Sequence, residues 1–133
     1  MKRKLKILLV DDEEEFIVTL AERLELRGYQ STIAEDGESA LAKFDPDFFD
    51  VVVLDLMMPG IGGLDVLARL KEIRQDTPVI LLTGHGSTRE GMEGMRLGAF
   101  DYLMKPLHIE ELVRKIDEAV PQDSSQAGRE ECG

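Results

Sequence analysis

The chain has 133 residues, of which 43% are hydrophobic, and a formal net charge of −11 at pH 7. This length suits one domain with a single core, and the hydrophobic content is too high for a disordered chain. The longest apolar runs, of four to six residues, are far too short to span a membrane, and the acidic balance argues against binding to nucleic acid or anionic lipid.

The negative charge is concentrated in the body of the chain. The basic residues among the first six contribute +4 and the segment from Pro121 onward contributes −2, which leaves −13 for residues 7–120. A body of this charge attracts metal cations and basic protein surfaces. Cys132 is the only cysteine, and Asp11 ends the first apolar run too early for a signal peptide. We therefore expect a protein of the reducing cytoplasm.

Strand and helix patterns alternate five times along the chain. Strands are predicted from short runs of aliphatic residues, and helices from apolar residues that recur every three or four positions. In chain order, we predict a strand at 5–10, a helix at 13–27, a strand at 30–34, a helix at 36–44, a strand at 50–55, a helix at 63–73, a strand at 79–83, a helix at 87–97, a strand at 100–104 and a helix at 108–119. Asp12 is expected to cap the first helix, and Gly28 to end it in a left-handed conformation.

The third predicted strand is apolar on both faces, which is typical of a central strand in a parallel sheet covered by helices on both sides. Five strand–helix units with right-handed crossovers predict a doubly wound, five-stranded α/β fold of the flavodoxin-like kind. The strand order 2-1-3-4-5 is one of two common orders for such sheets. We expect one domain at residues 1–120, followed by a disordered acidic tail at 121–133.

Polar and charged residues follow four of the predicted strands: Asp11, Asp12, Asp55, Thr83 and Lys105. Because parallel strands all run the same way, these side chains should meet at one edge of the sheet, where open α/β sheets bind their ligands. Each residue also has an ordinary interpretation, since acids cap helices, a threonine can fill a strand and a lysine can lie on the surface. Their convergence favours a divalent cation and a phosphoryl group.

Carboxylates gathered at one sheet edge are unfavourable unless a cation joins them. Mg²⁺ prefers hard oxygen ligands, which carboxylates, a backbone carbonyl and waters or phosphoryl oxygens would supply. Asp55 is the candidate nucleophile that forms an acyl phosphate. Lys105 could bind the phosphoryl oxygens, Thr83 could donate a hydrogen bond to one of them, and Gly84 would let a backbone N–H approach closely.

Several motifs that occur in order carry a family resemblance: Asp11-Asp12, Asp55-Leu56-Met57-Met58-Pro59-Gly60, Thr83-Gly84 and Gly98-Ala99-Phe100-Asp101-Tyr102-Leu103-Met104-Lys105-Pro106. With them, residues 4–120 resemble the receiver domain of bacterial two-component response regulators. The resemblance implies a phosphoprotein of a phosphorelay, phosphorylated on Asp55 by a sensor histidine kinase or a histidine phosphotransfer protein. It also implies Mg²⁺ as cofactor, with Asp12 and Asp55 as direct ligands, Asp11 acting through water and Met57 ligating through its carbonyl.

The same resemblance assigns the phosphoryl-contacting and switch residues. Thr83, Gly84 and Lys105 would contact the phosphoryl group, and the Lys105–Pro106 peptide would be cis. Tyr102 matches the switch aromatic, although an ordinary half-buried tyrosine is the alternative. His85 and Met57 occupy the positions that tune hydrolysis of the acyl phosphate, and the apolar Met57 predicts a long-lived phosphorylated state.

We therefore expect a phosphorylation switch, without enzymatic turnover beyond slow autodephosphorylation. It would regulate a partner or an output through its fourth helix, fifth strand and fifth helix, as a monomer or a phosphorylation-dependent dimer. A Mg²⁺-dependent phosphohydrolase is one alternative, but such enzymes usually carry an aspartate where Met57 stands. A pseudo-receiver that binds partners without phosphorylation is the other. The chain is either a single-domain regulator or the receiver part of a longer protein.

Glycines mark two further features of the sequence. Five of them fall between Gly84 and Gly98, which predicts either a marginal fourth helix that phosphorylation can reshape or simple tolerance of glycine on the surface. Gly62-Gly63 stands where the family often has an acidic or amide residue before glycine. We expect this pair to loosen the loop before the third helix without affecting the site.

Overall fold

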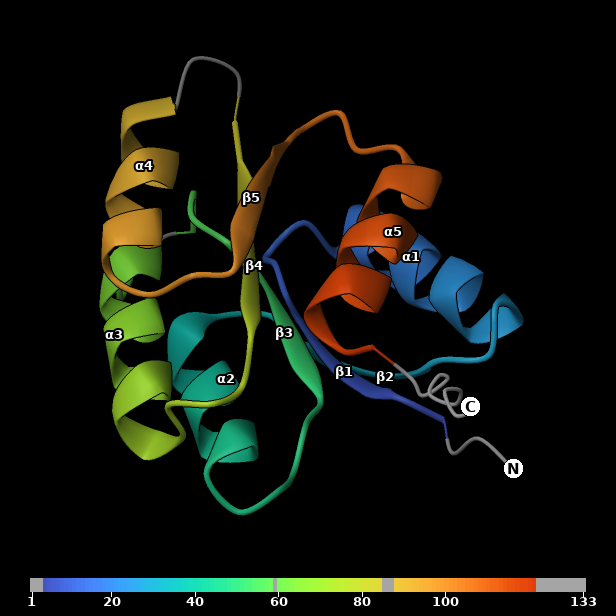
Figure 1. The fold of residues 1–133 in the computed structure, drawn as a ribbon, viewed down its shortest axis with the longest axis horizontal. Helices are drawn as coiled ribbons and strands as arrows, with labels where there is room; N and C mark the ends of the chain where they lie inside the picture. The colour runs from blue at the N-terminus through green and yellow to red at the C-terminus, as the bar shows by residue number, and fades with distance from the viewer. Residues whose placement is uncertain (1–3, 59, 85–87, 122–133) are drawn as a thin grey trace, which may run out of the picture.

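The computed structural model describes residues 4–58, 60–84 and 88–121, and every structural statement below concerns these residues. They form five strands and five helices in alternation (Figure 1). In chain order these are β1 (Lys6–Val10), α1 (Glu14–Leu26), β2 (Gln30–Ala34), α2 (Gly37–Phe44), β3 (Val51–Asp55), α3 (Gly63–Ile73), β4 (Val79–Thr83), α4 (Thr88–Arg96), β5 (Asp101–Met104) and α5 (Ile109–Ala119). Each predicted element is confirmed to within one residue at either end.

All five strands are parallel, in the predicted order β2-β1-β3-β4-β5. The chain reverses its direction of winding between β1 and β3, which lie side by side with Val10 paired to Leu54. This register sets the residues that follow these two, Asp11 and Asp55, at the same level of the sheet edge. It is the reason that acids so far apart in the sequence become neighbours.

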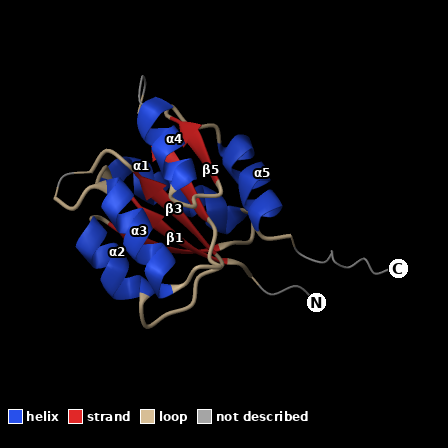
Figure 2. Cartoon of the chain, turned by 60° about the vertical axis from the view of Figure 1, so that its left-hand side comes forward, coloured by secondary structure: helices blue, strands red, loops and turns tan. Residues whose placement is uncertain are grey.

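Two apolar layers hold the sheet between its helices. Helices α1 and α5 cover one face, and α2, α3 and α4 cover the other (Figures 1 and 2). The alternation within a strand divides the core, since Leu8 and Val10 face the α2–α4 layer whereas Ile7 and Leu9 face α1 and α5. Strands β3 and β4 are buried along their whole length, as expected for central parallel strands.

The ends of the first two helices follow local backbone chemistry. Gly28 closes α1 with a φ of +95°, as predicted. The prediction that Asp12 caps α1 is wrong: the N-cap is Glu13, without a side-chain cap bond. The Glu13 N–H is instead donated to the Asp11 carboxylate at 2.9 Å. At α2, Asp36 does cap the helix by accepting the Ser39 N–H at 2.7 Å.

Two glycines bring α4 close to the sheet. Gly91 and Gly94 are buried, and a Cβ on Gly91 would lie 2.7 Å from the Tyr102 ring, while one on Gly94 would collide with Leu81. Surface tolerance therefore does not explain these two glycines, because only a residue without a side chain permits this approach.

Gly63 has a similar function at the start of α3. It is buried, and a Cβ there would lie 2.6 Å from the Leu56 Cα and 3.1 Å from the Asp55 carbonyl oxygen. The expectation that the glycine pair merely loosens a loop away from the site is thus wrong for Gly63. Of the pair, Gly62 has room for a side chain, because a Cβ there would lie 3.9 Å from its nearest neighbour, Asp65 Oδ2.

Two predictions concern residues that the structure does not describe. His85 and the acidic tail after Pro121 both lie outside the described ranges. Within those ranges, no helix is both long and apolar enough to cross a bilayer.

Candidate functional site

Three carboxylates meet where β1 and β3 end. Asp11, Asp12 and Asp55 each place an oxygen within 4.8 Å of the other two. Asp11 and Asp55 are almost completely buried, with 0% and 2% of their surface exposed, whereas Asp12 faces solvent. The cluster therefore has a buried floor and an open side, which a ligand needs in order to enter.

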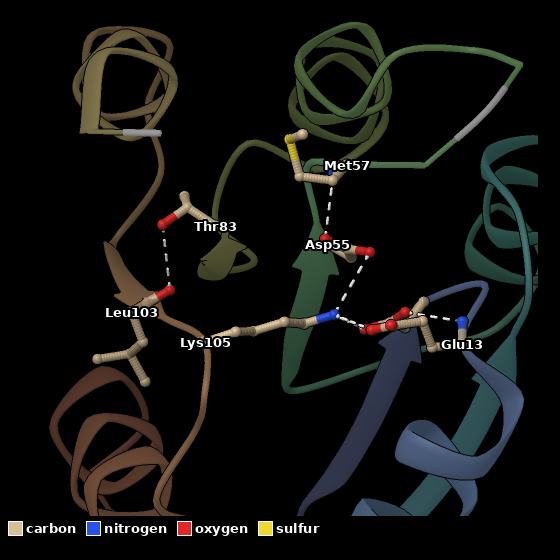
Figure 3. A network of polar contacts seen from close by, with 7 residues as sticks. Glu13, Asp55, Met57, Thr83, Leu103 and Lys105 are labelled. Carbon is tan, nitrogen blue, oxygen red and sulfur yellow. Dashed lines mark hydrogen bonds and ion pairs between the residues drawn. The ribbon is translucent and has the colours of Figure 1, made fainter. Parts of the chain in front are cut away.

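Lys105 reaches this cluster from the end of β5 (Figure 3). Its Nζ lies 2.8 Å from an Asp11 oxygen, 2.7 Å from a Glu13 oxygen and 3.7 Å from an Asp55 oxygen. It also lies 4.5 Å from the centre of the Phe16 ring, within the range of a cation–π contact. The lysine thus joins β5 to β1 and β3, and its peptide bond to Pro106 is cis, as predicted.

The two buried aspartates are each oriented by the backbone that follows them. Asp11 Oδ1 accepts the Glu13 N–H at 2.9 Å, and Asp55 Oδ1 accepts the Met57 N–H at 3.1 Å. An aspartate side chain readily accepts the N–H two residues on, which is why both strand ends turn in the same way. In each case the second oxygen, Oδ2, faces Lys105.

Burial and charge shift the acid–base properties of the site. Burial, with a smaller contribution from the neighbouring Asp11, raises the pKa of Asp55 to about 6, against the opposing effects of the Met57 N–H and Lys105. For Lys105, burial lowers the pKa, but the hydrogen bonds to Asp11 and Glu13 outweigh it, so that the net shift is upward. At neutral pH the lysine is charged and Asp55 is mostly ionised.

The donor set fits a hard divalent cation. The oxygens of Asp11, Asp12 and Asp55 lie within 4.8 Å of one another, a separation compatible with a shared Mg²⁺ that binds some acids directly and others through water. Among the described residues at this edge, Lys105 pairs with the carboxylates of Asp11, Glu13 and Asp55, and Asp12 adds a fourth carboxylate beside Asp11 and Asp55. The excess of negative charge gives a cation a strong electrostatic reason to bind.

Thr83 ends β4 beside these groups, but its hydroxyl is turned away from them. The hydroxyl oxygen lies 3.5 Å from the Leu103 carbonyl oxygen on β5, to which it donates (Figure 3). Tyr102, one residue before Leu103, is half-buried and packs against Gly91 of α4. Thr83 and Tyr102 are therefore linked through β5, and the partly buried Gly84 follows Thr83 in the chain.

Glu13 and Phe16 were not predicted from the sequence as partners of Lys105. Their signal was present in the sequence, because Glu13 follows the two aspartates in the same turn and Phe16 lies one helical turn further on. Without knowledge of where Lys105 would point, that signal could not be distinguished from an ordinary acidic helix start. Met57, two residues after Asp55, is 57% exposed.

Comparisons with known proteins agree with this geometry. Residues 7–117 match the response regulator receiver domain family. The chain is 48% identical over 111 residues to the transcriptional regulatory protein CpxR of Klebsiella pneumoniae, a match that covers 84% of this chain and 47% of that protein. The chain thus spans about half the length of the curated relatives it matches.

Solved structures give the same result. A response regulator receiver domain protein from Clostridium thermocellum superimposes with a TM-score of 0.84 at 34% identity, covering 90% of this chain and 97% of that one. The receiver domain of NtrX from Brucella abortus gives a TM-score of 0.83 at 30% identity, covering 87% and 98%. By its sequence and its fold, the chain belongs to the response regulator receiver domain family.

Proposed function

We propose that Asp55 accepts a phosphoryl group from a phosphohistidine and that the chain acts as a phosphorylation-controlled switch. The observation that carries this proposal is the meeting of Asp11, Asp12 and Asp55 within 4.8 Å, with Lys105 lying against them. Family membership supports a histidine kinase or a histidine phosphotransfer protein as the donor.

The transfer exchanges one bond for another. An oxygen of the Asp55 carboxylate attacks the phosphorus of phosphohistidine, a P–O bond forms, and the P–N bond breaks with its electron pair leaving on the imidazole nitrogen, which takes up a proton. A carboxylate whose pKa is about 6 is mostly ionised at pH 7 and so is available as the nucleophile. Hydrolysis of the acyl phosphate by water would later return Asp55 and release inorganic phosphate.

We assign the metal to Asp12 and Asp55 as direct ligands, with Asp11 acting through water and the Met57 carbonyl completing the protein ligands. Mg²⁺ bound there would supply positive charge that screens the incoming phosphoryl oxygens from the acids. The hydrogen bond from the Met57 N–H already fixes the orientation of the Asp55 carboxylate. Asp12, exposed at the rim, is placed to meet an ion that arrives from solvent.

Lys105, Thr83 and Gly84 would receive the phosphoryl oxygens. Lys105 is poised 3.7 Å from Asp55, whereas Thr83 must exchange its long contact with Leu103 for one with the phosphoryl group. Tyr102 adjoins Leu103 and packs on α4. The movement of Thr83 would therefore change the conformation of the surface formed by α4, β5 and α5. We propose this surface as the one that regulates a partner or an output domain.

The surroundings of the site support these partners. A groove of about 450 Å³ between α1 and the segment leading into α5 adjoins Lys105 through Phe16, and we assign it to the histidine-bearing helix of the donor. On the α4–β5–α5 surface, Met92, Met95 and Met104 are exposed and offer adaptable apolar contacts. We propose that this segment works in the cytoplasm and that, being acidic, it does not itself contact nucleic acid.

Incubation with acetyl phosphate and Mg²⁺, followed by intact mass measurement, tests the proposal. The expected result is one adduct of about +80 Da, the mass of one phosphoryl group, that requires Mg²⁺ and is lost in Asp55→Asn. Continuous release of phosphate from small esters would instead indicate a phosphohydrolase. An unmodified chain would indicate a pseudo-receiver, and either outcome would contradict the proposal.

Met57 gives a prediction about the lifetime of the phosphorylated state. Its exposed apolar side chain stands beside Asp55 and cannot orient an attacking water, so Met57→Asn should shorten the half-life of the acyl phosphate. Dephosphorylation followed by intact mass is the measurement, and Met57→Leu, which keeps an apolar side chain, is the control. An unchanged or longer half-life in the asparagine variant would refute this role.

A further inference from the structure

The Lys105 ammonium contacts Glu13, whose carboxylate does not belong to the predicted site. The two short contacts of the ammonium go to Asp11, at 2.8 Å, and to Glu13, at 2.7 Å, while Asp55 is 3.7 Å away. An ammonium has three N–H donors, so these two carboxylates occupy two of them. Lys105 therefore binds Glu13 more closely than it binds the aspartate that it is expected to serve.

Glu13 differs from the other carboxylates around the lysine in its freedom to move. Its side chain is 64% exposed, whereas those of Asp11 and Asp55 are 0% and 3% exposed. Its backbone is nevertheless fixed, because its N–H is donated to Asp11 at 2.9 Å. Glu13 is thus tethered at the mouth of the site with a carboxylate that reaches Lys105 and can also return to water (Figure 3).

From this geometry we propose that Glu13 is a positioning residue that holds Lys105 in the unphosphorylated chain and competes with the phosphoryl group for its ammonium. The inference rests on the proposed function of Asp55. A phosphoryl group on Asp55 brings negative oxygens toward the same ammonium, so Glu13 both occupies a donor that they need and repels them. When Glu13 leaves Lys105, the ammonium can bind the phosphoryl oxygens. The contact between Glu13 and Lys105 therefore opposes the phosphorylated state.

Beryllofluoride, which mimics a phosphoryl group on a carboxylate, tests this proposal without a phosphodonor. With saturating Mg²⁺, binding is followed by amide NMR of the whole chain. Glu13→Gln should lower the half-saturating beryllofluoride concentration by roughly two- to fivefold, the change expected when one partly exposed ion pair is lost. The control is Glu15→Gln, which removes the same charge from the first turn of α1, where Glu15 forms no ion pair with Lys105 among the described residues. It should leave the concentration close to that of the wild type.

A Mg²⁺ titration without beryllofluoride separates positioning from metal binding. If Glu13 acts on the lysine, the two glutamine variants should bind Mg²⁺ with affinities within roughly twofold of each other. A selective loss of Mg²⁺ affinity in Glu13→Gln would overturn the proposal in favour of a metal-side role. Equal beryllofluoride binding by both variants, or weaker binding by Glu13→Gln, would overturn it as well. Failure of the proposed function is a different result, in which the wild type binds no beryllofluoride or Asp55→Asn binds it equally well.

Discussion

Asp55→Asn is expected to stabilise the metal-free protein at pH 7 by about 2–3 kcal/mol, although it removes the proposed phosphoacceptor. A pKa raised to about 6 means that the folded state disfavours the charged carboxylate, and each tenfold weakening of the acid corresponds to about 1.4 kcal/mol. Asparagine removes that charge while its side-chain oxygen can still accept the Met57 N–H. Urea unfolding in the presence of a chelator measures the difference.

The sign of the pH dependence follows from the two protonation states. Between about pH 4 and pH 6 the folded protein holds a proton on Asp55 that the unfolded chain has released, so the free energy of unfolding falls as the pH rises through this interval. The advantage of Asp55→Asn should therefore be near zero at pH 4 and complete by pH 7. A variant no more stable than the wild type at pH 7, or a difference independent of pH, would contradict this account.

A second buried carboxylate next to the same strand supplies the control. Asp50 precedes β3, is 5% exposed and accepts the Lys6 N–H at 2.8 Å. Asp50→Asn should not gain stability, because the acid cluster found among the described residues contains Asp55 but not Asp50. Mg²⁺ should stabilise the wild type and Asp50→Asn, but should have little effect on Asp55→Asn, which lacks a proposed ligand.

Gly63→Ala is expected to destabilise the protein by about 3 kcal/mol, because the added methyl group meets backbone that cannot easily give way. The new Cβ would lie 2.6 Å from the Leu56 Cα, and the gain in helix propensity is only about 1 kcal/mol. Since the Asp55 carbonyl is also within 3.1 Å, relief of the clash would displace the end of β3 and weaken Mg²⁺ binding.

The neighbouring Gly62 provides a matched control for the Gly63→Ala substitution. Gly62 has a φ of −62° and a ψ of 150°, which alanine adopts freely, and its Cβ would have open space. Gly62→Ala should therefore be neutral or stabilising by less than about 1 kcal/mol. Urea midpoints of the two variants measure the contrast. Equal effects would show that Gly63 does not set the packing of α3 against β3.

Much of the fold was predictable because its signals are local and repeated. Residues 51–54 are apolar on both faces, which is typical of a central parallel strand. Once the strands are parallel, Asp11 and Asp55 must lie at one edge, so the acid cluster follows from topology without any knowledge of side-chain conformations. The cis peptide at Pro106 was expected from the family resemblance alone.

The remaining features depend on contacts between distant residues. The ion pair of Lys105 with Glu13 joins positions 92 apart, and no local pattern indicates which acid a lysine will reach. Asp12 was a reasonable cap, but the buried Asp11 takes the N–H of Glu13 instead. The role of Gly63 was missed because its close neighbour, the Leu56 backbone, is identified only when α3 is packed against β3.

Chemical mapping of the phosphorylated residue tests the central claim most directly. Borohydride reduces an aspartyl phosphate to homoserine, which peptide sequencing by mass spectrometry then locates. After incubation with acetyl phosphate and Mg²⁺, homoserine should appear at position 55 and not at positions 11 or 12. Homoserine at another position, or phosphate that survives reduction on a hydroxyl or imidazole side chain, would contradict the account.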